Sequence, residues 1–226
     1  EKDVFLKGHA EAALTFEEGK RNYTQLVFRP KSKYVDGPVH LDVDLHFEKE
    51  TFVPTQLFID FAELLGFELW NVLKTEFQIT IVRKMKCYQK PNKVWATGCH
   101  IYFNVKVPIA LSRSTRVAAI ELDYFKALNP VNSVEAQIDP TLTERRNGFV
   151  LCGDFKGVGM GGQYMPVFGG MMHCGWQEVH HWSPDKLPDC MLHLLHILYD
   201  FVWEPEETSP VNMPSVVSVV ELVPKT

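Results

Sequence analysis

Residues 39–47 alternate strictly between apolar and polar side chains, and no other stretch of the chain constrains its fold as strongly. Successive side chains of a β-strand point to opposite faces, so the apolar residues share one face and the polar residues share the other. The polar face then carries His40, Asp42, Asp44 and His46. We therefore predict a strand that buries one face and holds two carboxylates side by side on the other.

Asp42 and Asp44 should both be charged at neutral pH, and two like charges this close repel each other unless a cation lies between them. Carboxylate oxygens are ligands that Mg²⁺ and Mn²⁺ prefer. A solvated strand face is the alternative interpretation of an isolated Asp-x-Asp pattern. The pair alone leaves both interpretations open, and the choice depends on the rest of the chain.

The composition indicates a folded chain that does not cross a membrane. Of the 226 residues, 46% are hydrophobic, which is typical of a protein with a packed core rather than of a disordered one. The sequence has no apolar run of about 18 residues, the length that a transmembrane helix needs. The five cysteines are odd in number and scattered, which predicts a reducing intracellular compartment rather than a disulfide framework.

The formal net charge of -5 argues against a protein coated in positive charge. It does not exclude nucleic-acid binding, because local basic patches set the electrostatic field near a groove. Basic residues cluster in short segments beside the predicted strands. The candidate nucleic-acid-binding residues are Lys31, Lys33, Arg83, Lys84 and Lys86.

Periodicity and turn signals predict an α+β fold, with an antiparallel or mixed sheet backed by helices. We expect strands near residues 23–28, 39–47, 77–88, 94–107 and 148–152, and helices over about 55–73, 114–128 and 187–202. Thr55 and Ser114 are the expected N-caps of the first two helices. The buried stripe of the second helix should consist of Val117, Ile120, Tyr124 and Phe125. Residues 77–88 and 94–107 should pair as an antiparallel hairpin, and the glycine-rich residues 157–170 should form a loop or tight turn.

Three further motifs follow the aspartate strand. Thr97-Gly98-Cys99 leads into His100, which opens the polar face of a second alternating strand, and a glycine there lets a ligand approach the backbone closely. Ile138-Asp139-Pro140 supplies a third aspartate, and Lys156 follows an apolar strand among glycines. Each motif taken singly also has an ordinary interpretation, as an exposed histidine, a turn-forming aspartate or a solvated loop lysine.

The order of these motifs resembles that of the archaeo-eukaryotic primase superfamily, and in particular of the primase domain in primase–helicases of large DNA viruses. The family motifs are hydrophobic-Asp-hydrophobic-Asp, a Gly-x-His turn, hydrophobic-Asp, a strand followed by a lysine, and a Tyr-x-Pro-like segment. Here they read Leu41-Asp42-Val43-Asp44, Thr97-Gly98-Cys99-His100-Ile101-Tyr102-Phe103, Ile138-Asp139, Gly153-Asp154-Phe155-Lys156 and Tyr164-Met165-Pro166. The resemblance spans about residues 25–170. The family commonly carries an arginine in the strand before that lysine, where this chain has Val150 and Leu151.

The resemblance implies an α+β primase fold, with an RRM-like catalytic sheet, flanking helices and an N-terminal α/β lobe. Residues 1–226 would be one primase catalytic domain, a fragment of a longer primase–helicase in which a helicase domain follows. The implied activity is template-directed, metal-dependent nucleotidyl transfer that makes primers for DNA replication. Its partners would be a single-stranded DNA template and nucleoside triphosphates.

The resemblance also assigns roles to individual residues. Two Mg²⁺ or Mn²⁺ ions would be held by Asp42, Asp44 and Asp139, which makes these three the expected catalytic residues. His100 would bind the phosphates of the incoming nucleotide. Further nucleotide contacts are expected from Thr97, Gly98, Lys156 and Arg29.

Three alternatives remain open. A metal-dependent nuclease or phosphohydrolase would use the same carboxylates with a water nucleophile. A non-catalytic RRM-like module would bind nucleic acid through aromatic residues on its sheet, and the polar face offers only Tyr102. A structural zinc site could draw on Cys152, His173, Cys174, His180, His181 and Cys190, although no regular CxxC or HxxxH spacing supports it.

Overall fold

An antiparallel sheet of seven strands forms the centre of the protein, which we describe from a computed structural model covering residues 27–28, 36–84, 86–140, 149–150 and 164–181. The strands lie in the order β6-β2-β5-β3-β8-β9, and β4 pairs with β5 beside this path. Their bounds are β2 Asp36–Phe47, β3 Phe77–Lys84, β4 Tyr88–Gln89, β5 Trp95–Pro108, β6 Ile138–Asp139, β8 Tyr164–Met172 and β9 Trp176–His181. A separate antiparallel pair joins β1 (Val27–Phe28) to β7 (Phe149–Val150).

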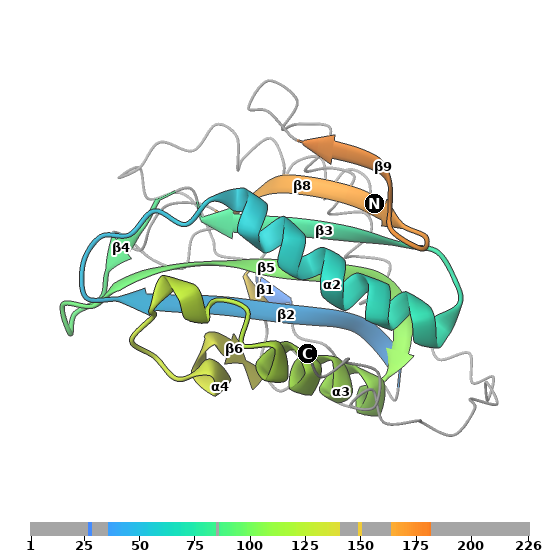
Figure 1. Ribbon diagram of the computed structural model, residues 1–226, viewed down its shortest axis with the longest axis horizontal. Helices are drawn as coiled ribbons and strands as arrows, with labels where there is room; N and C mark the ends of the chain where they lie inside the picture. The colour runs from blue at the N-terminus through green and yellow to red at the C-terminus, as the bar shows by residue number, and fades with distance from the viewer. Residues whose placement is uncertain (1–26, 29–35, 85, 141–148, 151–163, 182–226) are drawn as a thin grey trace.

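Two helices cover one face of the sheet, which makes the protein an α+β fold, as predicted. Helix α2 (Thr55–Leu73) packs against β3, β5 and β8, and α3 (Ile109–Leu122) packs against β2, β5 and β6. In Figure 1 α2 crosses in front of the strands, and α3 lies along the lower edge of the sheet, below β2. Two shorter elements follow α3, the 3-10 helix η1 (Lys126–Leu128) and α4 (Val134–Gln137). The expected N-terminal α/β lobe falls largely outside the described residues.

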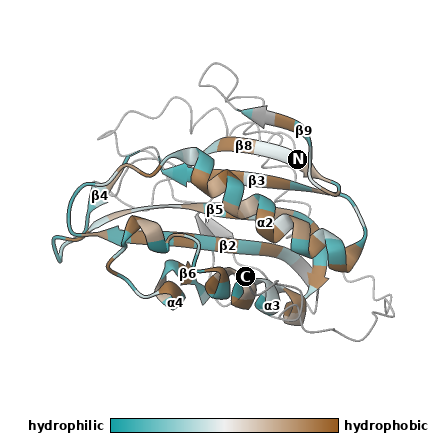
Figure 2. Cartoon of the chain, viewed as in Figure 1, coloured by the Kyte–Doolittle hydropathy of each residue, from teal (hydrophilic) through white to brown (hydrophobic). Residues whose placement is uncertain are grey.

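The alternating strand is confirmed as β2. Its apolar side chains are all buried against the helices: Val39, Leu41, Val43, Leu45 and Phe47. They join the core with Phe58 and Phe61 of α2, which are fully buried and contact Phe125 beyond α3. Figure 2 shows hydrophobic and hydrophilic residues alternating around α2, the pattern of a helix with one buried side. The polar side chains of β2 consequently lie on the sheet face opposite the helices.

The first helix has the predicted extent, but its N-cap residue differs from the predicted one. Pro54 occupies the N-cap position without a side-chain hydrogen bond, and Thr55 is already helical. The Thr55 hydroxyl instead accepts a hydrogen bond from Nη1 of Arg83 at 2.9 Å. Proline fixes the backbone before the first turn, so the helix starts without a capping side chain. The prediction of Thr55 as the N-cap is therefore wrong.

The second helix begins at Ile109, five residues before the predicted Ser114, directly after Pro108 ends β5. Ser114 lies inside the helix, where its hydroxyl donates to the carbonyl of Ala110 at 3.1 Å. The buried side of the helix consists of Leu111, Ser112, Thr115 and Ala119, whereas Val117, a predicted core residue, is 44% exposed. The helix ends at Leu122 because Asp123 adopts a left-handed conformation, whereas Phe125 is buried as predicted.

The glycine-rich prediction is wrong for residues 164–170, which belong to strand β8. Gly170 lies against the Trp176 ring, and a Cβ at this position would approach that ring to 2.9 Å. The glycine thus makes room for an aromatic side chain within the sheet rather than forming a turn. The antiparallel pairing of the strands at 77–84 and 95–108 is confirmed. The helix expected near 187–202 and most of the strand at 148–152 lie outside the described residues.

Candidate active site

The register of three neighbouring strands brings the sequence motifs together. Asp42 of β2 pairs with His100 of β5 on one side and with Asp139 of β6 on the other. Asp44, two residues along β2, pairs with Gly98. Directly opposed residues of an antiparallel pair point to the same face of the sheet, so the three carboxylates and the imidazole share the face away from the helices. Four motif residues far apart in the chain therefore meet on one surface.

A hollow opens on this face over the start of β5. It is lined by Asp42, Val43, Asp44, Lys84, Tyr88, Thr97, Gly98, Cys99, Asp139 and Tyr164. The aspartates come from β2 and β6, whereas Lys84 comes from β3 and the two tyrosines come from β4 and β8. The hollow therefore has an acidic wall and a wall of one lysine and two tyrosines, which face each other across β5.

Small residues on β5 create the floor of the hollow. Gly98 lies between the two walls, and Ala96 pairs with both His46 of β2 and Tyr88 of β4. A Cβ on Gly98 would lie only 1.8 Å from the carbonyl oxygen of Val43, which is impossible without moving β2. Glycine is thus required by the close approach of the neighbouring strand. The sequence interpretation assigned that space to a ligand, and the neighbour found there is the backbone of β2.

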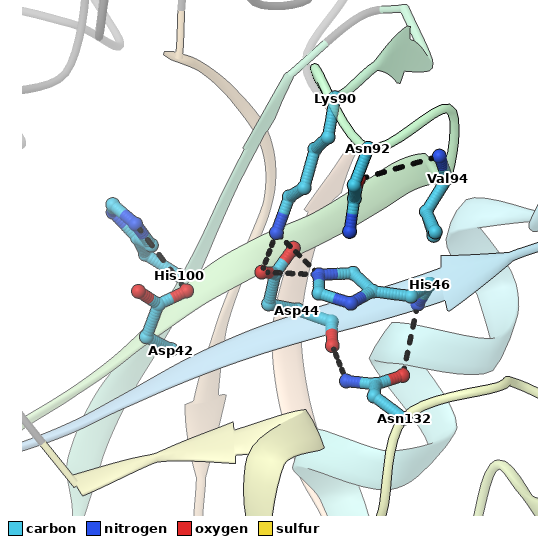
Figure 3. A network of polar contacts seen from close by, with 8 residues as sticks. All are labelled: Asp42, Asp44, His46, Lys90, Asn92, Val94, His100 and Asn132. Atoms are coloured by element: carbon cyan, nitrogen blue, oxygen red, sulfur yellow. Dashed lines mark hydrogen bonds and ion pairs between the residues drawn. The ribbon is translucent and has the colours of Figure 1, made fainter.

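Asp44 belongs to a polar network at the open end of the acidic wall (Figure 3). Nζ of Lys90 donates to its Oδ2 at 2.9 Å, and Nε2 of His46 lies 2.8 Å from the same oxygen. Nζ of Lys90 also contacts Nε2 of His46. Burial alone would raise the pKa of Asp44, but the Lys90 ammonium and the His46 ring hold its pKa below the ordinary value. Asp44 is consequently charged at neutral pH.

His100 lies next to Asp42, as its register partner on β5. Its ring stacks on Tyr164 with centroids 4.3 Å apart, and its Nδ1 lies 3.2 Å from the Tyr102 hydroxyl. Nε2 lies 3.6 Å from Oδ1 of Asp42, longer than a hydrogen bond. The ring is 4% exposed and Tyr102 is 2% exposed. The orientation of this imidazole is therefore fixed by two tyrosines, and Nε2 is the ring atom that faces the carboxylates.

The opposite wall joins a buried lysine to two tyrosines. Lys84 is 4% exposed, and its Nζ lies 3.9 Å from the centroid of the Tyr88 ring and 5.2 Å from that of Tyr164. Burial, followed by the charges of Asp44 and Asp42, raises the pKa of Tyr88 to about 12. Burial, Asp42 and the neighbouring Tyr88 likewise raise the pKa of Tyr164. Both phenols stay protonated at neutral pH, so they remain hydrogen-bond donors.

The connection between α3 and β6 is tied to the sheet close to the aspartates. Asn132 donates to the carbonyl of Asp44 at 2.8 Å and accepts a hydrogen bond from the amide of His46 at 3.0 Å. Arg116 of α3 donates through Nε to the carbonyl of Ile138 at 2.8 Å and through Nη2 to that of Glu135 at 3.0 Å. These two side chains hold β6, and with it Asp139, against the edge of β2.

The carboxylates fit a divalent cation by their chemistry. Asp42, Asp44 and Asp139 offer hard oxygen ligands on one face, the donor type that Mg²⁺ and Mn²⁺ select. As the side chains lie, no three potential ligands converge on one point in the part of the chain that is described. Oδ2 of Asp44 is engaged by Lys90 and His46. A cation bound through Asp44 would therefore compete with the Lys90 ammonium for the same carboxylate charge.

Two predicted nucleotide contacts are corrected by the register. Thr97 pairs with Leu45, so its side chain belongs to the helix-covered face, and it is 2% exposed. Thr97 was expected to offer a hydroxyl to phosphate, and that role is wrong because the hydroxyl lies on the face away from the carboxylates. Gly98 does lie in the hollow, although its close neighbour is the β2 backbone.

The predicted basic strip of β3 is split between the two faces of the sheet. Arg83 is buried on the helix side, where Nη1 donates to the carbonyl of Val53 at 3.1 Å and to Thr55. This position contradicts a role for Arg83 in contacting a nucleic-acid backbone. Lys84 lies in the hollow, whereas Lys86 is exposed beyond the strand. Strand alternation, which separates neighbouring side chains, explains the split.

The remaining predicted contacts, to nucleotide, nucleic acid and zinc, fall partly or wholly outside the described residues. Arg29, Lys31, Lys33 and Lys156 are not among the described residues, so their predicted contacts stay predictions. Of the expected zinc ligands, Cys152 and Cys190 also lie outside, and Cys174 and His181 are exposed. Nδ1 of His173 lies 2.7 Å from a carboxylate oxygen of Glu76. The zinc site stays a prediction.

Sequence reasoning missed several residues of the hollow. Tyr88, Lys90 and Tyr164 are absent from the candidate site residues, and Tyr102 is the only aromatic that the alternation predicts on this face. Tyr88 and Tyr164 line the hollow, so that expectation is wrong. The signal for Lys90 was its position beside the Pro91-Asn92 turn of a hairpin whose return strand carries the Gly-x-His motif.

No helix among the described residues combines the length and the apolar character that crossing a membrane requires.

In the comparisons with known proteins, no protein-family model and no curated protein matches the chain.

Proposed function

We propose that the protein is the primase catalytic domain of a primase–helicase, and that it makes primers for DNA replication by template-directed nucleotidyl transfer. The observation that carries the proposal is the register in which Asp42 lies between His100 and Asp139. Three of the motifs that carry the primase resemblance are scattered in the sequence, yet their residues are register partners on one face of the sheet. The archaeo-eukaryotic primase fold, with its RRM-like catalytic sheet, is part of the same proposal.

The charge distribution of the hollow supports this chemistry. Phosphoryl transfer is catalysed mainly by positioning and by neutralising negative charge. On the acidic wall, Asp42, Asp44 and Asp139 would hold Mg²⁺ or Mn²⁺, and two such cations would activate the attacking 3′-hydroxyl and neutralise the leaving pyrophosphate. On the other wall, Lys84 and the Tyr88 hydroxyl would donate to phosphate oxygens. A metal–triphosphate complex, positive on one side and negative on the other, is complementary to these two walls.

His100 would bind the triphosphate through Nε2. Tyr102 and Tyr164 fix the ring, so the nitrogen that faces Asp42 would be presented to phosphate without reorganisation. The template would be single-stranded DNA, held by the exposed Lys86 and by Lys31 and Lys33. The helicase domain, expected in the same parent chain, belongs to this proposal as well.

Primer synthesis on single-stranded DNA with nucleoside triphosphates and Mn²⁺ or Mg²⁺ tests the proposal. We expect the wild-type chain to make primers or extend them, and Asp42→Asn to abolish synthesis while the melting temperature stays within a few degrees. Asp123→Asn is the matched control, because Asp123 is remote from the hollow and asparagine tolerates its left-handed backbone. Wild-type synthesis rates in Asp42→Asn would refute the assignment.

The same assay separates the alternatives. A nuclease would shorten a primed template instead of extending it, and Asp42→Asn would abolish that degradation. A non-catalytic RRM-like module would bind DNA without consuming nucleotide. The burial of Tyr102 and Tyr164 argues against this last alternative, since such modules stack bases on accessible rings.

A further inference from the structure

Lys90 is the residue of the hollow's rim whose role neither the motifs nor the proposed chemistry accounts for. Its ammonium contacts Oδ2 of Asp44, one of the two oxygens of a carboxylate that is expected to hold a cation. We propose that Lys90 is an internal counter-ion that occupies Asp44 in the metal-free protein and competes with the divalent cation for it. This inference rests on the proposed function, because it takes Asp44 as a metal ligand.

The hairpin backbone fixes where Lys90 stands. The amide of Lys90 donates to the carbonyl of Val94 at 2.8 Å, and the amide of Lys93 donates to the carbonyl of Lys90 at 2.9 Å. Lys93 adopts a left-handed conformation that closes this tight turn. Strand β4, which leads into the turn, is itself paired with β5. Lys90 is thus held at the base of a closed turn.

The floor of the hollow allows the lysine to reach the carboxylate. Lys90 follows β4, whereas Asp44 lies on β2, and β5 runs between these two strands. The β5 residues on this face are Ala96 and Gly98, which leave the space above the strand open. Figure 3 shows the Lys90 side chain extending across β5 to Asp44 and His46. A larger residue at either position would stand in its path.

The electrostatics explain why a counter-ion is needed. Asp42, Asp44 and Asp139 crowd three negative charges onto one patch of the sheet, which costs free energy when no cation is bound. The Lys90 ammonium is a donor without acceptor atoms, and it places its positive charge directly against the Asp44 carboxylate. Lys90 and Asp44 are 25% and 33% exposed, so their attraction is partly screened and weak enough to be reversed by a divalent ion.

Release of Lys90 has a consequence for substrate binding. When a divalent cation takes Asp44, the ammonium loses its partner while it remains tethered at the rim of the hollow. The strongest new partner is an anion that arrives with the metal, and the triphosphate is such an anion. Lys90 should therefore weaken the binding of metal alone and strengthen the binding of nucleotide once metal is present. These opposite effects on metal binding and on nucleotide binding distinguish Lys90 from a lysine that only stabilises the fold.

Calorimetric titration of the full chain with Mn²⁺ alone tests the competition. We expect Lys90→Met to bind Mn²⁺ about three- to tenfold more tightly than wild type, the range that follows from removing a partly exposed ion pair. Lys93→Met is the matched control: it removes the same charge from the same turn but lies away from Asp44, and it should leave the Kd within about twofold. Lys90→Arg should behave like wild type.

A second titration uses a nucleoside triphosphate at saturating Ca²⁺, so that no turnover occurs. It tests whether the Lys90 ammonium, once displaced from Asp44, binds the triphosphate. Lys90→Met should bind nucleotide several-fold more weakly, and Lys93→Met should not. An unchanged or weaker Mn²⁺ affinity in Lys90→Met overturns the inference, and so does unchanged nucleotide affinity.

Asp44→Asn distinguishes failure of the proposed metal site from failure of the proposed role of Lys90. If Asp44→Asn leaves Mn²⁺ binding intact, the proposed metal site itself fails; if it abolishes Mn²⁺ binding while Lys90→Met changes nothing, only the role of Lys90 fails.

Discussion

Asp42 and Asp139 are register partners on adjacent antiparallel strands, although β3, β5 and both long helices lie between them in the chain. The strand that carries Asp139 is only two residues long, so backbone pairing alone holds it weakly. The position of the Asp139 carboxylate therefore depends on side chains that hydrogen-bond the connection before β6 to β2 and α3.

Arg116 is one of these side chains, and we expect Arg116→Lys to weaken Mn²⁺ binding. Lysine keeps the charge but cannot serve the carbonyls of Ile138 and Glu135 in the same fork geometry. Loss of one such hydrogen bond should lower the free energy of unfolding by about 1 kcal/mol. Arg113→Lys, an exposed position on the same helix, is the control for both measurements. Equal Mn²⁺ affinities in the two variants would show that Arg116 does not position Asp139.

Gly98→Ala should destabilise the protein far more than Gly66→Ala. At Gly98 the new methyl group meets the Val43 backbone, which can move only with strand β2. At Gly66 it meets the ends of the Ile79 and Met172 side chains, which can rotate away. We expect a loss of about 3 kcal/mol or more at Gly98. At Gly66 we expect a change of no more than about 1 kcal/mol, because alanine also favours the helix. Urea denaturation of both variants checks the difference.

Arg83 and Lys86 should have opposite phenotypes despite their proximity in sequence. Arg83→Met leaves the buried Val53 carbonyl without its donor, which should cost about 1–3 kcal/mol of stability. Lys86→Met removes an exposed charge and should leave stability nearly unchanged. In binding to single-stranded DNA, Lys86→Met should lower the slope of log K against log salt by about 0.7 for each phosphate that Lys86 neutralises. A salt slope that falls in the folded Arg83→Met protein instead would reinstate Arg83 as a DNA contact.

Alkylation of the native protein should label Cys174 well before Cys99. Cys174 is exposed, whereas Cys99 is 1% exposed between the sheet and the helices. Burial raises the pKa of the Cys99 thiol, which suppresses the thiolate that reacts with iodoacetamide. Peptide mapping by mass spectrometry at pH 8 distinguishes each cysteine. Rapid labelling of Cys99 under native conditions would contradict its place in the core.

The sequence predicted the strand that matters most, because alternation over residues 39–47 depends only on local geometry. The meeting of Asp42, His100 and Asp139 was predicted through the order of the motifs; the register that causes it was not, since strand pairing is set by tertiary packing. The N-cap of the first helix and the start of the second were placed wrongly, because Pro54 and Pro108 occupy the N-cap positions without capping side chains.

Three further errors have different physical origins. Glycine content predicted a loop at Gly169 and Gly170, although packing of the Trp176 ring favours glycine within β8. Proximity in sequence predicted one basic strip of Arg83 and Lys84, although a strand sends neighbours to opposite faces. Lys90 was overlooked because its partner, Asp44, lies two strands away, across β5. The contact between Lys90 and Asp44 is distant in sequence, so local patterns carried no information about it. Strand alternation at Arg83 and Lys84 is a local signal that the prediction did not apply.

The close approach of β2 to Gly98 also determines how a mutational survey of this protein should be interpreted. Every substitution at position 98 adds a Cβ where the Val43 carbonyl stands, so every substitution should reduce the amount of intact protein. A screen that scores activity alone would rank Gly98 with Asp42 and Asp139, as if it took part in the chemistry. A parallel measurement of protein abundance in cells would separate them: aspartate variants would accumulate in normal amounts, whereas Gly98 variants would be degraded.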